Sequence, residues 1–380
     1  MAQALDHEDR ELSWTGRAVD IDRIEAELTK LRHLTAGDPD GSKVAIRTSL
    51  VNMVVHAEDD DTAARASRVI EDLATHHPSR ALVVIARPSE DESQIDASLA
   101  AHCHLAQGME QQVCCEEVTL HVSGRAALHL HSIIVPLLIP DLPVVVWWTG
   151  PLPDKSHLIE ELCDVADHFI VDSSRFADQL GDLARIRGLA SLHDCAIGDL
   201  NYERVRSWRD LVERHTGAAG LGDWLSSVKS AEIRYTGLAQ QTPAQAILFL
   251  AWLAVHCAWD LGSVSAQGSN RLTLRQDERE IPVYLEPVKY EGIDRGWLVS
   301  IKLAFERDGE AALLSVSRTG DPLHVTVRTE LPDGVREDHV RIEACDSQTV
   351  LMRQLDTAPH DPEFVRLLIA AAPLIQATRA

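Results

Sequence analysis

The chain has 380 residues, 45% of them hydrophobic, and its 59 acidic residues outnumber its 36 basic ones to give a formal net charge of −23. This length and apolar content suit two folded domains and exclude wholesale disorder. The acidic balance also excludes a broad nucleic-acid or anionic-membrane surface, because such surfaces depend on clustered lysine and arginine.

The N-terminal half predicts a helical extension followed by an α/β domain. In the first 40 residues, apolar side chains recur at spacings of three and four between Ile21 and Leu31, as on one face of a helix. Strand-like and helical segments then alternate to about residue 200. Runs such as VVVWW at 144–148 are apolar without alternation, as expected for strands covered on both faces. We therefore predict a mostly parallel sheet flanked by helices over residues 41–215.

A glycine-rich segment at 215–224 predicts the connection to a second domain. Thr242 and Pro243 then open an apolar helix, and because its apolar residues surround the axis we expect it to be central and buried. From 271 to 344, short alternating strands are separated by turns such as Asp308-Gly309, which predicts an antiparallel meander. With a final helix after Pro362, residues 223–380 are predicted to form an α+β domain.

No segment predicts a membrane span or an export signal. The most apolar stretch, 246–255, is far shorter than the roughly 20 residues that cross a bilayer. The N-terminus has neither a basic start nor an apolar run, so we expect a cytoplasmic protein. Seven cysteines without a C-x-x-C pair favour reduced thiols over a disulfide framework.

The search for catalytic signatures finds none. The sequence contains no G-x-G-x-x-G, G-x-x-x-x-G-K-[ST], H-E-x-x-H or G-x-S-x-G pattern, so no cofactor and no catalytic residue is predicted. Two alternating histidine pairs, His102 with His104 and His129 with His131, could share a face in a strand, with Cys114 as a third metal ligand. In a helix, however, residues two apart diverge, and we expect no metal site.

The cysteines between 103 and 115 leave two interpretations open. Cys114 and Cys115 are followed by Glu116 and Glu117, whose charges would raise a thiol pKa, so a catalytic cysteine is not expected. Cys103 is separated from the pair by a polar, loop-like stretch, so Cys103 with Cys114 or Cys115 could form a reversible thiol switch. Alternatively, one of the pair is a buried strand residue and its neighbour is partly exposed.

Polar and aromatic residues gather at the predicted strand ends. Arg80 lies between a helix and a strand, and Asp141 precedes a strand that ends in Trp148. Ligands of open α/β sheets bind at such ends, and tryptophan and arginine are favoured anchors in interfaces. The alternatives are a core or edge tryptophan, and a helix cap for Asp172 and Ser173 after a later strand.

Six tracts carry a family resemblance: HPSRALVVIA (77–86), CCEEVTLHVSG (114–124), LLIPDLPVVVWWTG (137–150), HFIVDSSRF (168–176), YERVRSWRDLVE (202–213) and AILFLAWLAVHCAWDLG (246–262). In this order they resemble the glucose-6-phosphate dehydrogenase assembly protein family, OpcA, from about residue 40 to at least 305. The resemblance implies a non-catalytic assembly factor and allosteric activator of that dehydrogenase, at the entry of the oxidative pentose phosphate pathway.

The resemblance also implies partners. Glucose-6-phosphate dehydrogenase is the expected partner, and the Cys-Cys-Glu string is like that of the photosynthetic branch of the family, for which control by thioredoxin has been proposed. The candidate partner-binding residues are Arg80, Asp141, Trp148, Trp208 and Arg209. Two alternatives stay open: a lactonase-like hydrolase that uses Arg80, Asp141 and Asp172, and a metabolite-sensing module. The hydrolase is disfavoured because phosphate sites normally show a glycine-rich turn or clustered basic residues.

Overall fold

The computed structural model describes residues 12–36, 45–46, 49–105, 112–153, 157–217, 221–237, 241–268, 270–356 and 363–379. The chain divides into two compact units, each assembled from separate segments. Unit 1 comprises Met1–Val171, His193–Ile197 and Leu351–His360, and unit 2 comprises Asp172–Leu192, Gly198–Val350 and Asp361–Ala380. The border expected at 215–223 therefore falls inside unit 2. None of the described helices is long and apolar enough to cross a membrane.

Unit 1 is built around a mostly parallel sheet, which confirms the α/β prediction. Its strands are β1 (Leu12–Gly16), β2 (Ala45–Ile46), β3 (Val51–Ala57), β4 (Ser79–Arg87), β5 (Ile95–Leu105), β6 (Gln112–Ser123), β7 (Val144–Trp148), β8 (His168–Val171) and β9 (Ala196–Asp199). The order is β1-β5-β6-β4-β3-β7-β8-β9, with β2 beside β6. The central pairs β3–β4, β3–β7, β4–β6 and β7–β8 are parallel, and only β1 and β5 join antiparallel to their neighbours.

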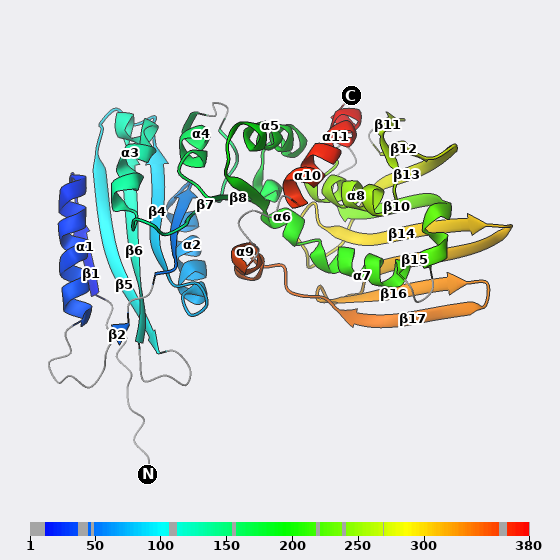
Figure 1. Ribbon diagram of the computed structural model, residues 1–380, viewed down its shortest axis with the longest axis horizontal. Helices are drawn as coiled ribbons and strands as arrows, with labels where there is room; N and C mark the ends of the chain where they lie inside the picture. Colours follow the sequence, from blue (N-terminus) through cyan, green and yellow to red (C-terminus); the bar gives the residue numbers. More distant parts are fainter. Residues whose placement is uncertain are drawn as a thin grey trace, which may run out of the picture. The chain divides into compact units, whose positions relative to one another are not determined.

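The apolar runs of the central strands form the core of this unit. All five residues of β7 are buried, as are the first seven of β4. Helices cover the sheet: α1 (Ile21–Ala36), α2 (Asp60–Leu73), the short η1, α3 and η2 (Gly124–Leu128, Leu130–Ile134, Val135–Leu137), α4 (His157–Cys163) and most of α9 (Ser347–Asp356). Helix α1 lies beside β1 and β5, and α2 packs on β3 and β4 (Figure 1).

Unit 2 holds a largely antiparallel eight-stranded sheet, as predicted. The strands are β10 (Val228–Thr236), β11 (Asp260–Ala266), β12 (Arg271–Gln276), β13 (Arg279–Val288), β14 (Leu298–Arg307), β15 (Glu310–Arg318), β16 (His324–Leu331) and β17 (Gly334–Arg341), in the order β11-β12-β13-β10-β14-β15-β16-β17. Only β10 and β13 pair in parallel. Asp308 and Gly309 turn the β14–β15 hairpin with φ of 53° and 83°, the left-handed values that a tight hairpin needs.

The helices of unit 2 pack around a buried helix, α8. They are η3 (Ser173–Arg175), α5 (Gln179–Leu192), α6 (Leu200–Glu203), α7 (Arg206–Thr216), η4 (Gly222–Ser227), α8 (Ala244–His256), α10 (Glu363–Ala370) and α11 (Ala372–Arg379). Every residue of α8 from 244 to 251 is buried, which confirms its predicted central position. Helices α5, α6, α7, α10 and α11 all contact it.

Candidate functional site

Four of the five predicted partner-binding side chains lie in the interior. Arg80, Trp148, Trp208 and Arg209 are 4%, 2%, 1% and 7% exposed. Only Asp141 is exposed, in the turn before β7, where its φ is 64°. A buried side chain cannot anchor a partner without rearrangement of the fold, so the prediction that the other four form a contact surface is corrected.

In unit 1, Arg80 and Trp148 are engaged with internal partners. The Arg80 guanidinium donates to Oε2 of Glu116 at 2.7 and 3.1 Å and to the carbonyl of Leu137 at 3.0 Å. Trp148 stacks on His56 with ring centroids 3.7 Å apart and planes 3° apart. Burial lowers the pKa of His56 to about 4, so this imidazole is neutral at physiological pH.

In unit 2, the Trp208-Arg209 pair stabilises packing between helices. Arg209 lies over the ring of Tyr202, 3.8 Å from its centroid, and donates to Glu363 at 2.8 Å. Tyr202 donates to the same carboxylate at 2.7 Å, so α6 and α7 are tied to α10. Arg318 lies over the ring of Trp208, 5.4 Å from its centroid.

Part of the predicted thiol switch falls outside the described side chains. The antiparallel register of β5 and β6 pairs Cys103 with Cys114 and His102 with Cys115. The side chains of Cys103 and Cys114 lie outside the described residues. Cys115 is a free, buried cysteine, and burial raises its pKa, which disfavours the reactive thiolate. Within the described part of the chain, no three His, Cys, Asp or Glu residues are placed to hold a metal ion.

The sheet order reverses at β3, because β4 lies on one side of it and β7 on the other. At such a point, α/β proteins bind ligands beyond the carboxyl ends of the strands, and phosphate groups sit on the N-terminus of the next helix. Here that helix, α2, starts with four acidic residues, Glu58 to Asp61. Asp59 caps it by accepting from the backbone N of Thr62 at 2.7 Å. The helix start is therefore already anionic and repels phosphate.

Glu58 also fills space beside β7. A Cβ atom added to Gly150 would lie 2.6 Å from Cγ of Glu58, so the glutamate side chain packs directly against this glycine. The carboxyl ends of β3 and β7 are therefore closed over by a side chain of the protein itself.

A second group of polar residues, in unit 2, is a buried hydrogen-bond network. Asp172 pairs with Arg204 at 2.7 Å and caps η3, as the predicted helix-cap alternative had it. Ser173 donates to Asp199 at 2.6 Å and accepts from Asn201 at 3.0 Å. Burial raises the pKa of Asp199 to about 7. Ser173 and Asp199 are both 0% exposed, so a substrate cannot reach them.

Two of the three residues of the hydrolase alternative are buried, and only Asp141 is exposed. Asp172 is 5% exposed and Arg80 is 4% exposed, and each is engaged in an ion pair with a neighbouring side chain. Neither can act on a substrate from its observed position.

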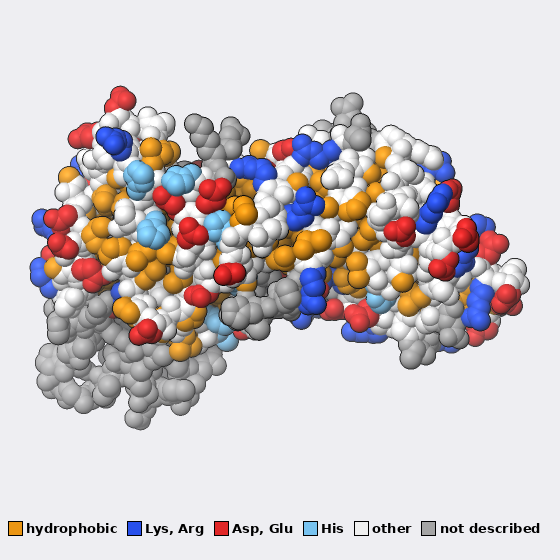
Figure 2. All heavy atoms as spheres, turned by 45° about the horizontal axis from the view of Figure 1, so that its top comes forward, with side chains coloured by type: hydrophobic (Ala, Val, Ile, Leu, Met, Phe, Trp, Pro, Cys, Tyr) orange, Lys and Arg blue, Asp and Glu red, His pale blue; other side chains and the backbone are white. Residues whose placement is uncertain are grey.

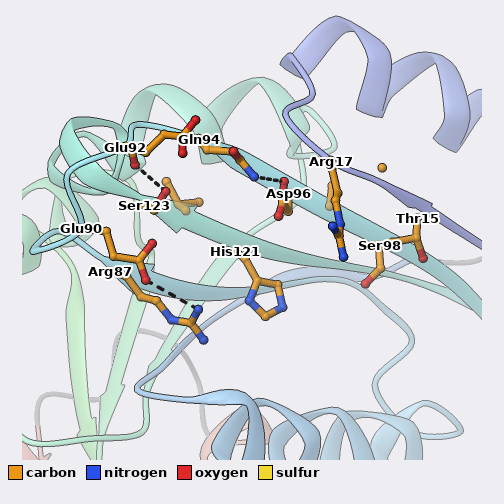
Figure 3. Close-up of a pocket in the computed structure, with 13 residues that line it drawn as sticks. Thr15, Arg17, Arg87, Glu90, Glu92, Gln94, Asp96, Ser98, His121 and Ser123 are labelled. Carbon is orange, nitrogen blue, oxygen red and sulfur yellow. Dashed lines mark hydrogen bonds and ion pairs between the residues drawn. The ribbon is translucent and has the colours of Figure 1, made fainter.

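An open polar pocket of about 400 Å³ lies in unit 1, where β4 and β6 end beside β5 and β1 (Figure 3). Arg87 and Ser123, the last residues of β4 and β6, are register partners. The pocket is lined by Thr15, Gly16, Arg17, Arg87, Glu90, Glu92, Gln94, Asp96, Ala97, Ser98, His121, Val122 and Ser123. The sequence did not predict this pocket, because five of its thirteen lining residues lie in β1 and β5 and neither segment was predicted as a strand.

Unit 2 has a larger pocket, of about 570 Å³, near the start of α8. Its charged groups are engaged with one another. Arg379 pairs with Asp178 at 2.9 Å, and Arg295 donates to Gln241 at 2.7 Å. Gln179 bridges the wall by donating to the carbonyl of Ser174 and accepting from Ala244.

Two family models match the chain. The glucose-6-phosphate dehydrogenase subunit N-terminal domain matches residues 70–188, and the C-terminal domain of the same subunit matches residues 195–368. Together they cover most of the sequence.

Curated relatives agree with these models. A "Putative OxPP cycle protein OpcA" from Nostoc punctiforme is 29% identical over 245 residues, which are 62% of this chain and 52% of that protein. The protein of the same name from Synechococcus elongatus is 28% identical over 257 residues, which are 65% of this chain and 56% of that protein. The chain thus spans about half the length of these relatives.

Solved structures of similar fold are remote. A levoglucosan dehydrogenase in complex with NADH and L-sorbose has a TM-score of 0.47 at 9% identity, over 87% of this chain and 97% of that one. An NAD binding oxidoreductase from Klebsiella pneumoniae has a TM-score of 0.48 at 9% identity, over 87% and 96%. A likeness of this size says nothing about the activity of the present chain.

Proposed function

The chain belongs to the OpcA family of glucose-6-phosphate dehydrogenase subunits, and from this premise we propose that it is a non-catalytic assembly factor and allosteric activator of glucose-6-phosphate dehydrogenase. The observation that carries the proposal is the pair of family matches over residues 70–188 and 195–368. We place this function in the oxidative pentose phosphate pathway, because the relatives are named as OxPP cycle proteins.

The start of α2 supports the non-catalytic part of the proposal. A nicotinamide dinucleotide carries a pyrophosphate, which needs backbone N–H groups and positive potential at a helix N-terminus. In this protein, Glu58 to Asp61 bring carboxylates to that position, and the Asp59 side chain already occupies the N–H of Thr62. Dinucleotide binding there would bring phosphate against this cluster of carboxylates.

A protein that activates the dehydrogenase without a chemical step of its own needs only to bind the active form more tightly than the inactive form. An effector that binds the active form of the dehydrogenase better by about 1 to 3 kcal/mol raises the substrate affinity about 5- to 150-fold. A protein surface can supply this difference. Acidic and basic side chains are interspersed over the face seen in Figure 2, and the net charge of −23 favours a partner surface with a positive patch.

The test is a titration of the full chain into glucose-6-phosphate dehydrogenase from the same organism. We expect the KM for glucose 6-phosphate to fall and the oligomer distribution of the dehydrogenase to change, as followed by initial rates and by light scattering after gel filtration. Unchanged kinetics together with separate elution would contradict the proposal.

A second arm tests the absence of catalysis. The chain alone is incubated with glucose 6-phosphate and NADP⁺ or NAD⁺, and separately with 6-phosphogluconolactone. We expect no turnover above the uncatalysed rate, and the appearance of reduced nucleotide or of accelerated lactone hydrolysis would show that the chain is an enzyme. We propose thioredoxin as a second partner if Cys103 and Cys114 form a disulfide, since thioredoxin would then reduce it.

A further inference from the structure

The pocket at the ends of β4 and β6 has the position of a ligand site. In open α/β sheets, ligands bind beyond the carboxyl ends of parallel strands, and β4 and β6 are parallel and end together here. Thr15 of β1 and Ser98 of β5 are register partners, as are Asp96 of β5 and His121 of β6, so each pair faces the same side of the sheet. The polar rows of three strands thus meet in one cavity.

Several hydrogen-bond donors in this pocket lack a partner in the part of the chain that the structure describes. No hydrogen bond or ion pair within 4 Å is found there for the Arg17 guanidinium or for the hydroxyls of Thr15 and Ser98. The Arg17 charge does reach Asp96, where it adds to the backbone N–H of Ala18 in lowering the pKa of that carboxyl. Figure 3 shows Arg17, Ser98 and His121 pointing toward the same space. A guanidinium flanked by hydroxyl groups is well suited to a carboxylate or a phosphate group.

Two other charged groups of the pocket, Asp96 and Arg87, already have partners. Asp96 accepts from the backbone N of Ala18 at 2.8 Å and from Gln94 at 2.6 Å. Arg87 lies 3.1 Å from Asp60 and 3.8 Å from Glu90. This part of the wall therefore presents carboxylates and a guanidinium side by side.

The carboxylates and the guanidinium of this wall determine which groups the ligand can carry besides its anionic group. A second anionic group would be repelled by Glu90 and Glu92, and an ammonium group would have to share Glu90 with the Arg87 guanidinium. A hydroxyl group both donates and accepts, so it can bind a carboxylate and a guanidinium at once. The volume of about 400 Å³ accommodates a molecule of several carbons, within the range of small-molecule sites.

We propose that the cavity formed by Arg17, Thr15 and Ser98 on one side and the mixed Arg87–Glu90 wall on the other binds a small hydroxylated anion, a molecule with one carboxylate or phosphate group and several hydroxyl groups. Arg17 and the two hydroxyls hold the anionic group, and Glu90 and Glu92 accept hydrogen bonds from the ligand hydroxyls. The site is contained in unit 1, and its test uses this chain without the proposed partner.

Calorimetric titration of the full chain tests the proposal with D-gluconate as the carboxylate probe and sn-glycerol 3-phosphate as the phosphate probe. Sorbitol supplies hydroxyls without charge, and acetate and inorganic phosphate supply charge without carbon-bound hydroxyls. We expect at least one hydroxylated anion to bind at least ten times more tightly than all three of these controls. Which of the two probes binds distinguishes a carboxylate from a phosphate ligand.

Variants connect the binding to the pocket. Arg17 is exposed, so Arg17→Gln should leave the melting temperature of the free protein unchanged and weaken binding at least tenfold. Arg336→Gln, at an exposed arginine of β17 in unit 2, is the matched control and should bind as the parent does. Hydrogen exchange in the presence of the bound probe should show protection within residues 87–98 and 121–123.

Three results would overturn the proposal. The first is the absence of saturable binding of both hydroxylated anions, which would make these residues a solvated sheet face. The second is binding that Arg17→Gln does not weaken. The third is tighter binding of glycine or glutamate than of either probe, because an ammonium group would then be preferred over hydroxyls.

Discussion

Arg80 and Glu116 lie opposite each other on neighbouring parallel strands and are 4% and 6% exposed, so each depends on the other for its charge to be tolerated. Arg80→Met should lower the free energy of unfolding by about 3 to 5 kcal/mol, because Glu116 would remain charged in the core without its counter-ion. The double variant Arg80→Met/Glu116→Met should recover most of this loss. Urea unfolding of the three proteins measures it, and a double variant no more stable than the single one would contradict the assignment.

The ionisation of Asp199 should lower the free energy of unfolding as the pH rises from about 4 to about 7. Its pKa is raised from 3.8 to about 7, chiefly by desolvation, so between pH 4 and 7 the folded chain holds a proton that the unfolded chain has lost. The contribution of this group to stability is therefore fully present below pH 4 and is lost as the pH rises through 7.

Asp199→Asn removes that dependence. The stability of this variant relative to the parent should increase from pH 4 to 7, by at most about 4 kcal/mol, and level off above pH 7. Denaturant titrations at several pH values measure the difference, with Asp308→Asn in an exposed turn as the control. A difference that stays constant across this range would show that Asp199 ionises at its ordinary pKa in the folded chain.

The β5–β6 register makes a specific prediction for the cysteines. Residues directly opposite in antiparallel strands have Cα atoms about 4.5 to 5.5 Å apart, which overlaps the spacing of disulfides. Oxidised glutathione should therefore link Cys103 to Cys114, with two thiols losing two electrons and two protons and the glutathione disulfide being reduced to two thiols.

Peptide mass spectrometry identifies the link. Cys115→Ser should retain it and Cys114→Ser should abolish it, because the register partner of Cys115 is His102. A Cys103–Cys115 link would mean that the register is wrong. If the Cys103–Cys114 link forms, reduced thioredoxin should reverse it, and the activation of the dehydrogenase should differ between the two forms.

At the scale of elements, long apolar runs were predictable and short or small-residue segments were not. The strand VVVWW and the start and burial of the helix after Pro243 were predicted correctly, because burial on all sides leaves a continuous apolar pattern. The helix was expected to continue to Gly262, but it ends at His256, and β11 begins at Asp260. Strand β5 was missed because its sequence, IDASLAAHCHL, is rich in small and polar residues. Residues 124–137 form three short helices in place of one, and Pro136 lacks the N–H that an uninterrupted α-helix would need.

The connection after β6 provides a test of an element boundary. Gly124 has a φ of 60°, and a Cβ there would lie 2.7 Å from the carbonyl oxygen of Glu92. Gly309, in the β14–β15 turn, has a φ of 83° and no atom within 4 Å of such a Cβ. Both Gly→Ala changes incur the left-handed backbone cost of about 1 to 2 kcal/mol.

Only Gly124→Ala should add a steric cost, of about 1 to 3 kcal/mol, because the segment at Glu92 must move. Thermal or urea unfolding of the two variants compares them directly. Equal losses at the two glycines would show that the chain at 92–93 yields freely and does not fix the end of β6.

At the scale of the whole molecule, the sequence predicts the family and the two kinds of sheet, but it does not predict the pocket of unit 1. The family tracts are continuous strings, so they can be read along the chain. The pocket joins Arg17, which follows β1, with Ser98 of β5 and His121 of β6, and only the sheet order brings these distant segments together. The predicted anchors failed for the opposite reason, since arginine and tryptophan are as suitable for an internal ion pair or a stacked ring as for an interface.

The interleaving of the two units leads to a final prediction. The glycine-rich segment at 215–224 was expected to connect two domains. However, α5, α6 and α7 precede its glycines at 217–222 and pack on α8 or β15, which follow them. A chain cut there leaves residues 1–217 with the apolar faces of three helices uncovered and without the segment 351–360 of unit 1.

Each half expressed alone should therefore aggregate or bind a hydrophobic dye and unfold without a cooperative transition. Co-expressed halves should purify together in a 1:1 ratio and unfold cooperatively, because α8 and its neighbours can then pack as they do in the intact chain. Gel filtration and thermal unfolding measure both outcomes. Two halves that are each soluble, monomeric and cooperative would show that the segment at 217–222 is a domain border after all.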